Sequence, residues 1–173
     1  MKKNNILYIS YDGLSDQVSS SQIIPYLKVL SELFNVCVIT CEKKEKYSKY
    51  LSIKKELFNK YNIDCRSIYF TPKNYSLFFS KFFDFVKLLV LTCSTIKSKN
   101  IKIIHCRGHI PAFLILILKK IFNLKLTFDY RGMWIEERID LNAINLNKIK
   151  DKLIYYLLKK FEKNTILSSS KII

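Results

Sequence analysis

The chain has 173 residues, 49% of them hydrophobic, and its 30 Lys and Arg against 14 Asp and Glu give a formal net charge of +16. This length suits one domain with a sizeable core, and 14% aromatic residues with only three Gly and three Pro exclude a disordered or low-complexity chain. The charge suggests an anionic partner. Because the basic residues are mostly scattered lysines, nucleic acid is disfavoured against an anionic membrane surface or an acidic small molecule.

The cysteines and the apolar runs indicate a cellular compartment. Five cysteines lie on apolar runs and never form Cys-x-x-Cys, so we predict buried thiols in a reducing cytosol. No cluster of His, Cys and Asp has the spacing of metal ligands, so we predict no metal site. The stretch MKKNNILYIS lacks the features of a signal peptide, and the most apolar run, residues 110–121, is interrupted by Lys119 and Lys120. We therefore expect a cytoplasmic protein, soluble or peripheral on the inner face of the cytoplasmic membrane.

Apolar strands alternate with longer helical patterns along the chain. Strands are predicted over residues 6–11, 36–41, 65–70, 101–105, 125–129 and 169–173. Helices are predicted over residues 22–34, where Ser21 can serve as the N-cap, and over 47–61, 76–99, 110–122 and 146–164. This alternation predicts an α/β protein with a doubly wound, Rossmann-like parallel sheet of strand order 3-2-1-4-5.

Polar residues concentrate in three loops that follow predicted strands, at residues 12–22, 106–109 and 130–137. The stretch 127–140, TFDYRGMWIEERID, alone holds two of the four arginines and the only Trp. Ligands of doubly wound sheets bind beyond the carboxyl ends of the strands, where the strand order reverses. The sequence therefore predicts one crevice lined by all three loops.

The arginines and acids of these loops allow two interpretations. Arg107 and Arg131 can donate paired hydrogen bonds to ligand hydroxyls, a carboxylate or a phosphate, or they can pair with Asp129, Glu136 or Glu137 and hold the three loops together. Asp129 follows a buried strand, where an ionised carboxylate needs a partner. The two glutamates can bind hydroxyls or act as first-turn carboxylates of a short helix.

The other polar and aromatic residues of the loops are similarly open. His105 and His109 can position a ligand hydroxyl or relay a proton, and for His105 a structural role is favoured. Trp134 can stack on a ligand ring, but a core position is favoured. Asp12 and Gly13 either form a turn or contact the ligand.

Several motifs together resemble a known family. They are Tyr11-Asp12-Gly13, Ser21-Gln22-x-x-Pro25-Tyr26-Leu27, Ile104-His-Cys-Arg-Gly108, and Phe128-Asp-Tyr-Arg-Gly-Met-Trp134 followed by Glu136-Glu-Arg138. Over essentially its whole length the chain resembles the N-terminal, acceptor-side domain of GT-B-fold glycosyltransferases of the family-4 type, which are retaining enzymes. Where that family often has a glycine before the Ser-Gln pair, this chain has Ser20.

The resemblance implies a hexosyltransferase-like enzyme of polysaccharide or cell-envelope synthesis, of which residues 1–173 would be one half. A nucleotide-sugar donor would be held mainly by a Rossmann-like domain outside these residues, without cofactor or metal, and the chain alone would be inactive. Its partners would be a sugar or lipid-linked sugar acceptor and, in a split enzyme, a separate chain with the missing domain. The implied catalytic residues are His109 and Asp129, and the implied substrate-binding residues are Asp12, Gly13, Ser21, Gln22, His105, Arg107, Arg131, Gly132, Glu136 and Glu137.

Two further interpretations stay open. A non-catalytic binding or regulatory module fits the same residues, whereas a flavodoxin-like or other nucleotide-binding domain is disfavoured because no Gly-x-Gly-x-x-Gly or Gly-Lys-Ser/Thr loop follows a strand. The predicted helix 76–99 combines five phenylalanines with lysines, and 146–164 carries six lysines and two acids. A core helix with a solvated lysine face is favoured for 76–99, but both helices could face anionic lipid.

Overall fold

The structure, a computed structural model, describes residues 3–72 and 77–173, so the predicted helix start at Ser76 lies outside the described residues, as does the side chain of Phe78. The strands are β1 (Asn5–Ser10), β2 (Asn35–Glu42), β3 (Asp64–Tyr69), β4 (Ile103–Arg107), β5 (Lys125–Asp129) and β6 (Lys171–Ile172). The helices are α1 (Ile24–Leu33), α2 (Tyr47–Tyr61), α3 (Leu77–Ser98), α4 (His109–Leu118), α5 (Trp134–Asp140) and α6 (Ile149–Ser168). A π-helical segment, η1 (Ser19–Ile23), precedes α1, and a 3-10 turn, η2 (Lys44–Lys46), precedes α2.

The sheet confirms the predicted fold class. Its strand order is β3-β2-β1-β4-β5-β6, and the pairs β1/β2, β2/β3 and β5/β6 are parallel. By contact density the chain divides within β4 into two compact units, Met1–His105 and Cys106–Ile173.

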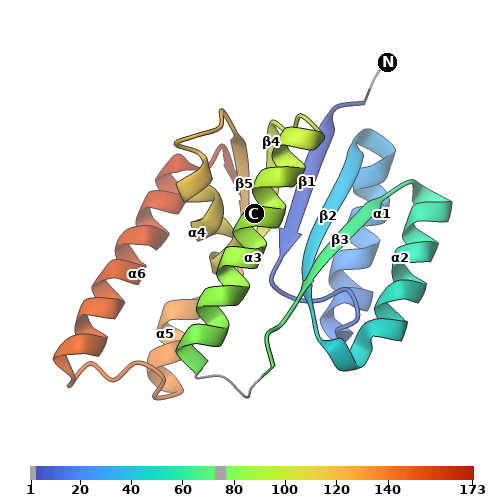
Figure 1. The fold of residues 1–173 in the computed structure, drawn as a ribbon. Coiled ribbons are helices and arrows are strands. Elements are labelled where there is room, and N and C mark those ends of the chain that lie inside the picture. Colours follow the sequence, from blue (N-terminus) through green and yellow to red (C-terminus); the bar gives the residue numbers. More distant parts are fainter. Residues whose placement is uncertain (1–2, 73–76) are drawn as a thin grey trace. The chain divides into compact units, whose positions relative to one another are not determined.

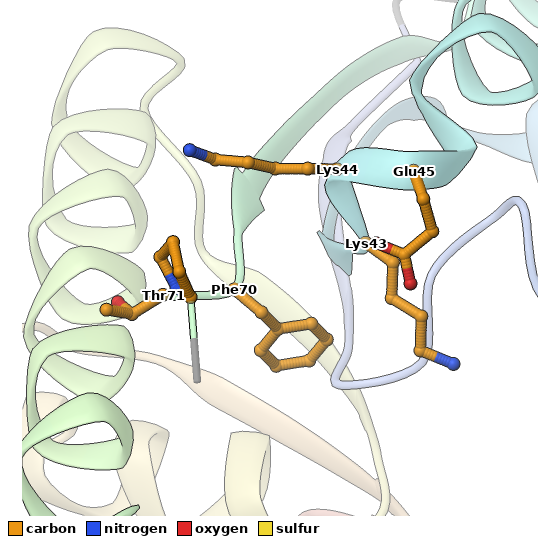
Figure 2. A pocket seen from close by; sticks show the side chains of 6 residues that line it. Lys43, Lys44, Glu45, Phe70 and Thr71 are labelled. Atoms are coloured by element: carbon orange, nitrogen blue, oxygen red, sulfur yellow. The ribbon is translucent and has the colours of Figure 1, made fainter. Parts of the chain in front are cut away.

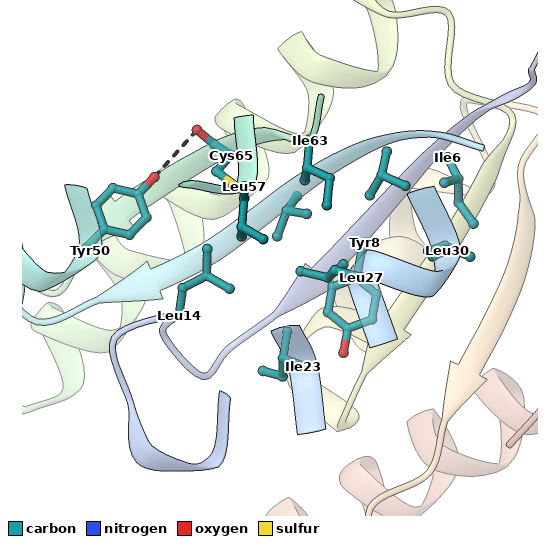
Figure 3. Packing of buried hydrophobic residues seen from close by; sticks show 12 residues of the cluster. Ile6, Tyr8, Leu14, Ile23, Leu27, Leu30, Tyr50, Leu57, Ile63 and Cys65 are labelled. Atoms are coloured by element: carbon teal, nitrogen blue, oxygen red, sulfur yellow. Dashed lines mark hydrogen bonds between the residues drawn. The ribbon is translucent and has the colours of Figure 1, made fainter. Parts of the chain in front are cut away.

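The first unit has helices on both faces of its strands (Figure 1). Alternate residues of the strands point to one face, where Tyr8 of β1 and Val38 of β2 pack against Leu27 of α1 and Leu57 of α2 (Figure 3). On β3, Cys65 faces this cluster, and its neighbour Arg66 points to the other face, where it donates a hydrogen bond to Thr95 of α3 at 3.1 Å. The period of two in the sequence thus sorts the side chains between two helical layers.

The second unit is built around α4, whose sequence HIPAFLILIL is almost entirely apolar. Ala112, Leu114 and Ile115 are fully buried, and α6 packs on α4 and on β5. Phe113 of α4 meets Phe161 of α6 with ring centroids 5.7 Å apart. A helix that is apolar on all sides is expected in such a covered position.

Several predicted boundaries are wrong: α4 ends at Leu118 and not at Phe122, and α6 spans Ile149–Ser168 and not residues 146–164. β4 ends two residues later than predicted, because the buried run continues from Ile104 through Arg107, so His105 lies within the strand and Gly108 alone links it to α4. Ser21 does not cap a helix, because it lies inside η1 and its hydroxyl bonds back to the Val18 carbonyl. The last strand is shorter than predicted, at Lys171 and Ile172, although the amides of Ser170 and Ile173 also donate to carbonyls of β5, at 2.7 and 3.0 Å.

The cysteines are free, as predicted. Cys37, Cys41, Cys65 and Cys106 are buried and Cys93 is half-buried, and in each case burial raises the pKa of the thiol. Within residues 3–72 and 77–173, no helix is long and apolar enough to cross a membrane. The same described ranges contain no group of three His, Cys, Asp or Glu side chains that could hold a metal ion.

Candidate functional site

The loop after β1 is held by a buried carboxylate that the sequence analysis did not identify. Glu42, the last residue of β2, accepts hydrogen bonds from the Leu14 amide at 2.6 Å and from the Ser15 hydroxyl at 2.6 Å. Thr40 of the same strand donates to it at 2.8 Å. The backbone donors of this loop are thus engaged by the protein itself, which fixes the path of the chain after Asp12.

Gly13 is required by this arrangement. A Cβ atom at this position would lie 2.6 Å from Glu42 Oε2 and 2.9 Å from the Cys41 carbonyl oxygen, closer than real Cβ atoms approach. The Gly13 amide donates to Asp16 at 3.2 Å, and Lys46 binds the same carboxylate at 2.6 Å. Burial alone would raise the pKa of Asp16, but the hydrogen bonds from Lys46 and Gly13 and the charge of Lys43 hold it below its usual value.

The remaining predicted residues of the first unit divide into exposed and buried ones. Asp12, Ser21 and Gln22 are exposed. His105 is buried in β4, where the Tyr26 hydroxyl lies 2.9 Å from its Nδ1 and the ring of Tyr8 lies 4.9 Å from its own ring. The His105 ring is thus buried among aromatic side chains, and the structural role favoured for it stays a prediction.

In the second unit, Arg107, Asp129 and Arg131 form what we call the arginine cluster. Asp129 Oδ2 lies 2.8 Å from Arg131 and 3.6 Å from Arg107, so one carboxylate serves both guanidinium groups. The Arg107 side chain is 5% exposed and that of Arg131 is 46% exposed. Arg107 is therefore placed to hold Asp129, whereas Arg131 is the member with surface available to a ligand.

The junction between β4 and α4 brings this cluster together. The Gly108 amide donates to the Asp129 carbonyl at 3.0 Å, which ties the end of β4 to the end of β5. Gly108 has φ 80° and ψ 175°, a conformation that is essentially restricted to glycine. The glycine of the His-Cys-Arg-Gly motif therefore sets the direction in which α4 leaves the sheet.

His109, the first residue of α4, is only 3% exposed. Its Nε2 lies 2.9 Å from Glu162 of α6, and the Trp134 ring stacks on it with centroids 5.5 Å apart. Tyr130 donates to the same Glu162 oxygen at 3.3 Å. His109 is thus a buried, oriented side chain, and the loop position that the sequence predicted for it is wrong because α4 begins one residue earlier.

Glu162 and Lys159 of α6 complete this network, and the sequence analysis missed both. Lys159 donates to Glu162 at 2.9 Å and also pairs with Glu136 of α5. Burial alone would raise the pKa of Glu162, but hydrogen bonds from Lys159 and His109 hold it below its usual value. Because His109 and Glu162 are 53 residues apart, no local sequence pattern links them.

The other residues of α5 lie around Trp134. The Arg138 guanidinium lies over the Trp134 ring, 5.0 Å from its centroid, so this ring contacts both Arg138 and His109. The core position favoured for Trp134 is met only in part, since its side chain is half-buried. Glu137 and Gly132 are exposed, and Gly132 has φ 76° at the turn into α5.

The predicted site residues are divided between the two units. The first holds Asp12, Gly13, Ser21, Gln22 and His105, and the second holds Arg107, His109, Asp129, Arg131, Gly132, Glu136 and Glu137. Within the second unit the structure gathers Arg107, Asp129 and Arg131 in one cluster. The single crevice that joins all three loops stays a prediction.

A separate pocket of about 640 Å³ lies in the first unit, beyond the carboxyl ends of β2 and β3 (Figure 2). Lys43, Lys44 and Glu45 line it from one side, and Phe70, Thr71 and Pro72 from the other. The Phe70 ring also packs edge-on against Tyr11, with centroids 5.3 Å apart. None of the predicted site residues lines this pocket.

Comparison with known proteins identifies the fold. No protein-family model matches the sequence, and no curated protein is significantly similar to it. Similar solved structures include UGT73P12 of Glycyrrhiza uralensis, complexed with glycyrrhetinic acid 3-O-monoglucuronide (TM-score 0.52, 8% identity, 79% of this chain and 30% of that one). A second is apo UGT2 of Phytolacca americana (TM-score 0.51, 8% identity, 81% of this chain and 33% of that one). A third is LpCGTa in complex with UDP (TM-score 0.52, 10% identity, 84% of this chain and 35% of that one).

These three neighbours are glycosyltransferases, and the chain spans 30–35% of their length. At 8–10% identity the likeness lies in the arrangement of strands and helices and does not extend to individual residues. The chain therefore has a Rossmann-like α/β fold of the kind found in GT-B glycosyltransferases.

Proposed function

We propose that this chain is the acceptor-binding half of a retaining glycosyltransferase that takes a sugar from a nucleotide-sugar. The acceptor is a sugar or lipid-linked sugar of a polysaccharide or of the cell envelope, reached from the cytoplasmic side of the membrane. The observation that carries the proposal is the arginine cluster at the carboxyl ends of β4 and β5, in a fold whose solved neighbours are glycosyltransferases. In such sheets ligands bind beyond the carboxyl ends of the strands, which is where the cluster lies.

In this proposal each member of the cluster has its own task. Arg131 donates hydrogen bonds to acceptor hydroxyls or to an acceptor phosphate, because its planar guanidinium is half-exposed. Asp129 orients Arg131, and the buried Arg107 holds Asp129 in place. The catalytic role that the family resemblance gives to Asp129 is then exerted through Arg131.

His109 acts in the proposal as a positioned group. Its contacts with Glu162 and Trp134 fix the ring orientation at the start of α4, beside the cluster. The donor is held by a domain outside these residues, and rate enhancement comes from placing the acceptor hydroxyl against the donor and from stabilising the departing phosphate. The chain alone is then catalytically silent.

Acceptor binding is tested by nuclear magnetic resonance on the ¹⁵N-labelled chain. The probes are glucose, galactose, mannose and N-acetylglucosamine, each free and as a short-chain prenyl diphosphate, with UDP-glucose as the donor probe. At least one acceptor probe should shift the amide signals of residues 107–109 and 129–137, and the Arg131→Gln variant should weaken that binding about tenfold, as expected for loss of a charged hydrogen bond. Arg66→Gln is the matched control, since Arg66 also pairs with an aspartate, Asp64, and belongs to the first unit.

The same material decides between the proposed half-enzyme and its alternatives. Transfer of labelled glucose from UDP-glucose to the acceptor probes should be at background, and robust turnover by the chain would contradict the half-enzyme. Acceptor binding that is equal in Arg131→Gln and wild type would remove the cluster from the site. A binding module without catalysis is favoured if the chain binds acceptor but recovers no transfer in a complex with a partner that binds nucleotide-sugar.

A further inference from the structure

The outward side of α6 carries an apolar stripe. Residues that face α4 and α5 recur at helical spacing and include the buried Glu162 and Thr165. The opposite side carries large apolar side chains at helical spacing from Ile149 to Leu157, and one more near the end of the helix. They are Ile149 (89% exposed), Leu153 (61%), Tyr156 (60%), Leu157 (47%) and Leu167 (73%).

Lysines border this stripe, and the acids of α6 do not. Lys150, Lys152, Lys160 and Lys163 are exposed. Asp151 accepts a hydrogen bond from the Asn145 amide at 3.0 Å, and Glu162 is buried against His109 and Lys159. The whole of α6 is described, so its outward side is apolar and cationic without an exposed carboxylate.

We propose that this α6 stripe is a docking surface for an anionic membrane. Soluble domains rarely leave a contiguous apolar patch uncovered, so the stripe indicates a partner. A second copy of the chain would bring two sets of lysines together, whereas anionic lipid headgroups complement the lysines and the acyl boundary covers the leucines. Tyr156 suits such an interface because its ring is apolar and its hydroxyl is polar.

In this arrangement α6 lies along the membrane surface. Twenty residues of helix extend about 30 Å, and the buried side of the helix stays on its own unit. The inference does not rest on glycosyl transfer, because lipid binding is measured on the chain itself. The sequence analysis allowed two helices, now α3 and α6, to face anionic lipid, and the inference selects α6. On α3, Lys87 already pairs with Asp84 and donates to Thr71.

The experiment is cosedimentation of the full chain with vesicles of phosphatidylcholine, alone or with about one-third phosphatidylglycerol. The chain should bind the anionic vesicles and not the neutral ones, and raising the salt from about 0.05 M to about 0.5 M should release it. The variant Lys152→Gln/Lys160→Gln should weaken binding about fivefold for each lysine. Lys49→Gln/Lys55→Gln, which removes the same charge from exposed positions of α2, should have a clearly smaller effect.

The apolar contribution is tested separately. Leu153→Gln/Leu157→Gln should weaken binding about tenfold without unfolding, because both side chains are exposed and Gln favours helix. The control Phe82→Gln/Phe83→Gln removes exposed apolar surface from α3 and should leave binding unchanged. The proposal is overturned by equal binding to neutral vesicles, by absence of binding to anionic ones, or by a larger effect of the α2 or α3 variants. A dimer in sedimentation velocity that Leu153→Gln/Leu157→Gln dissolves would instead assign the stripe to a second copy.

Discussion

At the level of single residues, Glu42 takes the place that an external anion occupies in many loops of doubly wound sheets. Its carboxylate accepts from the amides of Leu14 and Ser15 and from two hydroxyls. A loop whose donors are satisfied from within needs no ligand to stay ordered.

We expect Glu42→Ala to lower the free energy of unfolding by about 3 kcal/mol, because buried donors in the loop would lose their acceptor. Urea unfolding followed by circular dichroism measures this. Glu45→Ala is the control, since Glu45 is exposed three residues away and should change stability by less than about 0.5 kcal/mol. A Glu42→Ala variant as stable as the control would mean that water replaces the carboxylate without cost.

Glu162 links stability to pH. Its folded-state pKa lies below the ordinary value of 4.5, so the unfolded chain takes up protons first as the pH falls. The contribution of Glu162 to the free energy of unfolding is therefore complete above about pH 4.5, and it is lost as the pH drops through the lower pKa of the folded state. The difference in unfolding free energy between wild type and Glu162→Gln should stay constant at neutral pH and shrink in acid.

Lys159 provides the check on this pH dependence. Its ammonium group is the strongest favourable partner of the Glu162 carboxylate. Lys159→Gln should therefore make the acid limb of the stability curve shallower, as Glu162→Gln does. A Glu162→Gln curve that runs parallel to wild type down to the acid transition would show that the carboxylate is not held ionised by the fold.

At the level of elements, the β4–α4 junction depends on one backbone conformation. A Cβ at Gly108 would meet no atom within 4 Å, so substitution there tests the backbone alone. Gly108→Ala should cost about 2 kcal/mol, and Gly108→Asn should not recover it, because ψ 175° lies outside the left-handed region that Asn tolerates. Asn142→Gly, at φ 55°, is the control and should stay within about 1 kcal/mol of wild type. An alanine variant of wild-type stability would show that the junction can adopt another path.

The elements that the sequence predicted best are those with a complete local signal. The bounds of α2 (Tyr47–Tyr61) and β5 (Lys125–Asp129) match the prediction, because each is a regular pattern flanked by residues that end it. The end of β4 was placed too early because its last residue, Arg107, is charged by type and buried by contact. Its burial depends on Asp129, which is distant in sequence.

At the level of the whole molecule, the fold and the candidate site differ in how far sequence specifies them. Three glycosyltransferases share the fold at 8–10% identity, so layers and strand order follow from the pattern of apolar residues. The polar loop residues were identified because they directly follow strands that this apolar pattern predicts. Glu42, Lys159 and Glu162 were missed, since each acts on a residue 27 to 53 positions away or on a neighbouring helix.

The buried thiols allow local unfolding of the sheet to be measured by alkylation. Maleimides react with accessible thiolates, and Cys37, Cys41, Cys65 and Cys106 are both covered and held protonated, whereas Cys93 is half-buried. One label should therefore add quickly, at Cys93, and the rest only as the sheet opens. Because Cys37, Cys41 and Cys65 belong to the first unit and Cys106 to the second, mass spectrometry of the alkylation time course would yield separate opening rates for the two.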